Sequence, residues 1–177
     1  MRVSECGKAL AIAGTQAMAT GGSVHLPTLV AGCARMSGSY LLRSFSLNLH
    51  GMAPGQLVLS AQAAEKTQML IRYCAAALHA FGSSIPAEPG SALEDPAARL
   101  RLDFAQTQRL LEPVFAALKD QHALGDEEMA KACAVATGAL IHQFAKHVEP
   151  SVGFGLAAYG FTEGARTVPW RGSPDAA

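Results

Sequence analysis

The sequence predicts an all-α protein of six or seven helices, packed as a compact bundle or a two-layer array. Three observations favour this class. Apolar residues recur at alternating steps of three and four along most of the chain. Alanine, the strongest helix former, is abundant, and glycine or proline separates the periodic stretches. A single domain spanning residues 1–177 is expected, because one core suffices for a chain of this length.

The first two helices are predicted from their periodicity and their ends. The first covers about residues 3–20 and ends at Gly21 and Gly22, which tolerate the conformations that follow a helix. The second starts near Pro27, because a residue without an amide hydrogen suits the first turn. It is expected to end near residues 44–47.

A third helix follows a turn-rich connection at residues 48–55. Ser60 is its expected N-cap and Gly82 its expected C-terminal stop. The apolar stripe expected to face the core consists of Leu70, Tyr73, Ala77 and Phe81. Residues 83–93, with two prolines and one glycine, are interpreted as a surface crossover between the two halves of the chain.

In the second half, Asp95 and Pro96 resemble a cap followed by the first helical residue. Pro113 lies inside the apolar pattern that follows, so this helix is expected to be kinked or broken there. The next helix begins near Asp126, where three acidic residues suit the positive end of a helix. Pro150 is expected to stop it.

Residues 151–166 fit two patterns. Alternating apolar residues suggest a strand, whereas another set of apolar residues follows helical steps. A buried, tightly packed helix is favoured, because Gly160 and Gly164 would then lie on one side and let another backbone approach closely. The tail from about residue 167 is expected to be irregular.

Composition excludes several classes. The 14 basic residues balance the 14 acidic ones, which argues against a nucleic-acid partner. No stretch is apolar for long enough to predict a membrane span, so a cytoplasmic protein is expected. The cysteines are too widely spaced to form a CxxC motif and are expected to be buried, reduced thiols. They are Cys6, Cys33, Cys74 and Cys133.

No motif in the sequence predicts a cofactor or a metal. His142 and His147 lie five residues apart, so on a helix their rings would not face one ion. Ser37 lacks the strand–turn–helix context of a nucleophilic serine. Residues 153–158 match GxGxxA formally, but neither a preceding strand nor a later acidic residue supports nucleotide binding.

Two arginines, Arg35 and Arg43, lie on the otherwise apolar second helix. A buried arginine requires a carboxylate partner, which Glu149 or Glu163 could supply. The alternative is that both arginines extend to solvent along their aliphatic stems. If they are buried, we expect Arg43, Glu163 and Tyr159 to form a polar cluster inside the bundle. The candidate ligand-binding residues are Arg43, Tyr40, Tyr159 and Glu163.

These features predict a non-enzymatic interaction or assembly protein that forms a homodimer through faces rich in alanine and glycine. A helical bundle that binds an apolar small molecule is the first alternative. Its cavity would be lined by Tyr40, Tyr73, Phe104, Phe144 and Tyr159. The second alternative is a cofactor-free enzyme whose site is assembled from scattered residues.

Overall fold

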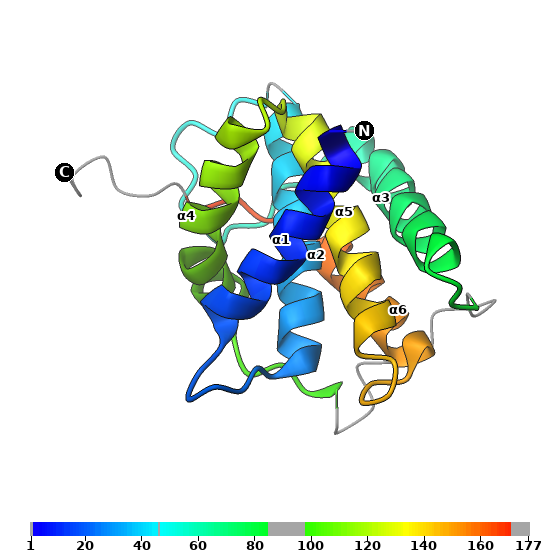
Figure 1. Ribbon diagram of the computed structural model, residues 1–177. Helices are drawn as coiled ribbons and strands as arrows, with labels where there is room; N and C mark the ends of the chain where they lie inside the picture. Colours follow the sequence, from blue (N-terminus) through cyan, green and yellow to red (C-terminus); the bar gives the residue numbers. More distant parts are fainter. Residues whose placement is uncertain (1, 46, 85–97, 171–177) are drawn as a thin grey trace.

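The structure is a computed structural model that describes residues 2–45, 47–84 and 98–170. It confirms the all-α class, with six helices in the described residues (Figure 1). They are α1 (Arg2–Met18), α2 (Leu26–Ser44), α3 (Ala61–Ala80), α4 (Phe104–Gln121), α5 (Asp126–Gln143) and α6 (Pro150–Ala165). None of these helices combines the length and the apolar character that crossing a bilayer requires.

Helix α2 is the centre of the bundle. Every residue from Pro27 to Leu42 is buried, so the helix has no solvent-facing side over these four turns. It packs most extensively against α6 and α5, and Figure 1 shows it surrounded by the other helices. The small side chains of Ala31, Ala34 and Gly38 allow this, because they let neighbouring axes come close on several sides.

The predicted helix over residues 151–166 is confirmed as α6, and its glycines contact α2 directly. A Cβ atom added to Gly164 would overlap the main-chain carbonyl of Arg35, and one added to Gly160 would lie 2.7 Å from the Ala31 oxygen. From the other side, a Cβ on Gly38 would overlap the Phe161 carbonyl. Glycine is therefore required wherever these two backbones cross.

Other small residues are also used inside the chain. A Cβ on Gly138 of α5 would lie 2.7 Å from the Cys74 carbonyl of α3, and one on Gly7 of α1 would lie 2.9 Å from Val135. The glycines of these helix faces are thus covered by other helices of the same molecule. These glycines are therefore used for packing inside the molecule, and the predicted homodimer stays a prediction.

The expected ends of α3 are confirmed. The Ser60 hydroxyl accepts a hydrogen bond from the Ala63 amide at 3.2 Å. At the other end, the Gly82 amide donates to the His79 carbonyl, and Gly82 has φ of +83°, a conformation that favours glycine. In contrast, Tyr73 and Phe81 were wrongly predicted to face the core, since each is 37% exposed. The predicted positions of Leu70 and Ala77 in the core are confirmed, and the buried face of α3 continues through Cys74 and Leu78 instead of Tyr73 and Phe81.

Helix α4 starts later than predicted. Its first residue is Phe104, and the Asp103 carboxylate caps it by accepting from the Gln106 amide at 2.7 Å. Asp95 and Pro96 lie outside the described residues, but residues 99–103 are not helical. Pro113 does not break the helix, which continues through it to Gln121.

Pro150 has the opposite role from the one predicted. Helix α5 already ends at Gln143, and Pro150 is the first residue of α6, where its missing amide hydrogen is harmless. The four cysteines are buried free thiols, as expected. Most of the predicted crossover at residues 83–93 lies outside the described residues.

Residues 166–170, which follow α6, are not helical, as expected, but they are anchored. Thr167, Val168 and Pro169 are buried. The Val58 amide donates to the Arg166 carbonyl at 2.7 Å, and the Val168 amide donates to the Gln56 carbonyl at 2.8 Å. This short pairing fixes the segment before α3 to the segment after α6.

Candidate functional site

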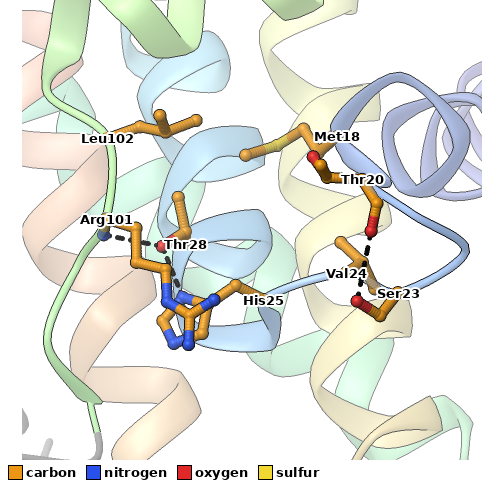
Figure 2. A pocket seen from close by; sticks show the side chains of 8 residues that line it. All are labelled: Met18, Thr20, Ser23, Val24, His25, Thr28, Arg101 and Leu102. Carbon is orange, nitrogen blue, oxygen red and sulfur yellow. Dashed lines mark hydrogen bonds between the residues drawn. The ribbon is translucent and has the colours of Figure 1, made fainter.

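A surface hollow of about 480 Å³ lies beside the start of α2 (Figure 2). Its size falls within the range of small-molecule sites, roughly 300–1,000 Å³. The end of α1, the turn into α2 and the segment before α4 form its walls. The lining residues are Met18, Thr20, Ser23, Val24, His25, Thr28, Arg101 and Leu102.

Three polar residues form one end of the hollow. The His25 Nδ1 atom lies 2.7 Å from the Thr28 hydroxyl oxygen, and that oxygen also accepts the Arg101 amide at 3.0 Å. The Arg101 guanidinium and the His25 ring overlap in the view of Figure 2, and the charge of Arg101 acts on this ring. Burial, and secondly the positive charge of Arg101, lower the pKa of His25. Two cationic groups therefore line the same space and repel one another when both are charged.

The local sequence explains why these groups converge. His25 is the N-cap of α2 and has an extended conformation, with φ of −82° and ψ of 103°. Its ring bonds to Thr28, three residues later on the first turn. On the far side, Gly21 and Gly22 adopt positive φ in a tight turn that returns the chain to α2. The Thr20 amide and the Ser23 carbonyl close this turn at 2.8 Å.

A buried ion pair holds the opposite wall of the hollow. Arg35 of α2 is only 3% exposed, and its Nε atom lies 2.5 Å from the Glu163 carboxylate of α6. The same guanidinium donates through Nη1 to the Leu102 carbonyl at 2.9 Å and to the Thr107 hydroxyl at 3.0 Å. Through these bonds, α6 and α2 together fix the segment that carries Leu102 and Arg101.

The prediction that Glu149 or Glu163 would pair with a buried arginine is thus confirmed for Arg35 and Glu163. The alternative, that the arginine extends to solvent, is wrong for Arg35. Tyr159 belongs to the same neighbourhood: burial, and then the negative charge of Glu163, raise the pKa of its phenol. This cluster acts on the hollow only through Leu102.

The expected meeting of Arg43 with Glu163 is wrong. The carboxylate partner of Arg43 is Glu112 of α4, with Nη1–Oε1 and Nη2–Oε2 distances of 2.5 and 2.7 Å. The Tyr40 hydroxyl donates to Glu112 at 3.4 Å, and the arginine lies over the Tyr40 ring. Burial is the main reason that the pKa of Tyr40 is raised. The predicted ligand residues are therefore divided between two clusters that join helices.

The residues of the hollow were largely missed by the sequence argument. His25 could have been noticed, because it directly precedes the proline-marked start of a helix. Arg101 gave no usable signal, since it was assigned to the interior of a helix that in fact begins at Phe104. Glu112 was missed for another reason. Its partner on α2 is 69 residues away, and nothing in the neighbouring sequence identifies it.

The predicted cavity for an apolar ligand can be compared with the hollows of the described residues. Two further hollows, of about 390 and 330 Å³, lie near residues 47–54 and between α1 and α3. Of the five aromatic residues proposed to surround a cavity, only Tyr73 lines any of the three hollows. Within the described ranges, no group of three histidine, cysteine or acidic side chains could hold a metal ion.

Comparisons of this chain with protein-family models, curated protein sequences and solved structures found no match.

Proposed function

We propose that the protein binds a small organic anion in the hollow beside His25. The observation that carries this proposal is that the side chains of Arg101 and His25 line the same hollow. An anion placed between them would offset the repulsion between their positive charges and would accept hydrogen bonds from both. Among the described residues, Arg101 has no carboxylate partner that would already satisfy it.

The rigidity of the hollow supports a binding role. Thr28 holds both the His25 ring and the Arg101 main chain, and Arg35 holds the next carbonyl, that of Leu102. A site whose walls are fixed before the ligand arrives loses less conformational entropy on binding than a mobile one. This support comes from α2, the most buried helix of the bundle.

The test is a titration of the protein with sodium acetate at constant ionic strength, followed by NMR of the His25 ring. We expect saturable shifts of the His25 signals in the parent protein and their loss in Arg101→Gln. Arg72→Gln is the matched control, because Arg72 is exposed on α3, which contributes no residue to the hollow. Shifts that are unsaturable, or that are equal in both variants, would contradict the proposal.

Self-association is a second proposal, which a different observation now favours. Leu57 and Leu59 are 72% and 92% exposed, and they flank Val58, which faces inward on the short pairing with residues 166–168. Two large apolar side chains on one exposed, extended segment are typical of a protein contact. The glycines at the helix contacts of α1, α2, α5 and α6 do not support this idea, since each lies against another helix of the same molecule.

Sedimentation velocity tests self-association at micromolar protein concentration. We expect a dimer in the parent protein and a monomer in the double variant Leu57→Ser, Leu59→Ser. The control is Ile12→Ser, which removes a similarly exposed apolar side chain from α1. A parent protein that sediments as a monomer would exclude the proposal.

A further inference from the structure

We infer that the anion bound in this hollow is an aliphatic monocarboxylate, with its carboxylate between Arg101 and His25 and its chain against Met18 and Leu102. The inference rests on the proposed function and specifies its ligand. It follows from the way in which polar and apolar groups are separated within the hollow.

Figure 2 shows this separation. The side chains of His25 and Arg101 lie together at one end, next to the Thr28 hydroxyl. At the other end, the side chains of Met18 and Leu102 point toward one another. A ligand that fills the hollow therefore needs a charged head and an apolar tail. An inorganic anion would leave the apolar end in contact with water.

The number of available donors favours a carboxylate over a phosphate head group. The Thr28 hydroxyl oxygen is already bonded to His25 and to the Arg101 amide, and the Ser23 hydroxyl donates to the Thr20 carbonyl. The Thr20 hydroxyl also lines the hollow, but it lies beside Met18, away from the charged end. Arg101 and His25 are then the remaining side-chain donors at that end. The Arg101 guanidinium and a His25 ring that protonates as the anion binds match the two oxygens and single charge of a carboxylate. A phosphate presents three oxygens and a charge near −2, so these two groups would leave one oxygen without a donor and part of the charge without a counter-charge.

The apolar end is formed before any ligand arrives. Leu102 is held through its carbonyl by Arg35, whose guanidinium is fixed in turn by Glu163. Met18 is the last residue of α1, and the tight turn at Gly21 and Gly22 follows it. A chain entering this end displaces water from existing apolar surface, so its affinity should rise with the number of methylene groups that it buries.

The experiment is isothermal titration calorimetry with acetate, butyrate and hexanoate at one pH and constant ionic strength, with inorganic phosphate as the comparison. We expect the affinity to rise by up to about fourfold for each methylene group that becomes buried, and phosphate to bind more weakly than hexanoate. Met18→Ser should flatten the dependence on chain length and leave acetate affinity nearly unchanged. Ile12→Ser is the matched control on the same helix, because Ile12 is exposed and does not line the hollow.

The possible results separate the two proposals. Equal affinities for acetate and hexanoate, or tighter binding of phosphate than of hexanoate, would overturn the aliphatic monocarboxylate and leave the anion site standing. A dependence on chain length that survives Met18→Ser but is lost in Ile12→Ser would place the chain elsewhere and also overturn this inference. No binding of any of the four anions would overturn both proposals.

Discussion

Arg35 of α2 and Glu163 of α6 form an ion pair where the two backbones are closest. The Arg35 side chain is fully enclosed, and the Glu163 carboxylate is about three-quarters buried. The same turn of α6 makes two kinds of contact with Arg35. Glu163 forms the ion pair, and Gly164, the next residue, lies directly against the Arg35 carbonyl. The glycine allows the approach, and the approach in turn places the carboxylate next to the arginine.

We predict that Glu163→Gln destabilises the protein by about 3 kcal/mol, because it leaves a buried guanidinium without its counter-charge. Urea unfolding measures the loss. Glu149→Gln is the control, since Glu149 is exposed at the start of the same helix and forms no ion pair within the described residues. Equal unfolding free energies for the two variants would show that the ion pair does not stabilise the fold.

The loss of stability caused by each glycine-to-alanine substitution in α6 should depend on the space around that glycine. Gly164→Ala and Gly160→Ala place a methyl group against main-chain atoms of α2, and we expect losses of about 1–3 kcal/mol despite better helix propensity. Gly153→Ala should be the mildest, because its neighbour is the side chain of Ile141, at 3.1 Å, which can adjust. Thermal unfolding of the three variants tests this order. A gain in stability at Gly164 would contradict the close contact.

The ionisation of His25 makes anion binding depend on pH. Burial and the charge of Arg101 lower the pKa of His25 below its usual value of 6.5. The folded protein therefore favours the neutral His25 ring more than the unfolded chain does. This contribution to stability is present above the unfolded pKa and is lost as the pH falls through the folded one. A bound anion has the opposite effect, since it stabilises the imidazolium.

We therefore predict that carboxylates bind more tightly as the pH falls below about 6.5, and that Arg101→Gln raises the pKa of His25 in the ligand-free protein. NMR titration of the histidine rings, with and without hexanoate, measures both effects. His142 serves as the internal reference, because it lies on α5 and contacts Ser83 and Phe81 instead of the hollow. An unchanged His25 pKa in the presence of saturating hexanoate would place the ligand elsewhere.

The four cysteines should be unreactive in the folded protein. Burial raises the pKa of Cys6 to about 11 and that of Cys33 to about 12, so almost no thiolate forms at pH 8. We expect none of the thiols to react rapidly with a disulfide reagent before unfolding, and all four to react in denaturant. Rapid modification of even one thiol without denaturant would show that the core opens locally.

Much of the fold was predictable because its signals are local. The capping hydroxyl of Ser60 and the left-handed Gly82 act on residues within one helical turn, so the chain order already contains their partners. The start of α4 was mistaken because Asp95 and Asp103 are both suitable caps. Asp103 has the Gln106 side chain to complete its capping box, and that box decides where the helix begins.

The sequence by itself determined the helical class, the glycine positions of α6, the buried thiols and the need of Arg35 for a carboxylate. Each follows from the backbone preferences or the desolvation cost of a single residue type. Only the tertiary structure decided that Arg43 pairs with Glu112, 69 residues away along the chain, and that His25 and Arg101 share a hollow. Such pairings depend on how the helices pack against α2. The periodicity of apolar residues within one helix does not identify the residues of other helices that will contact it.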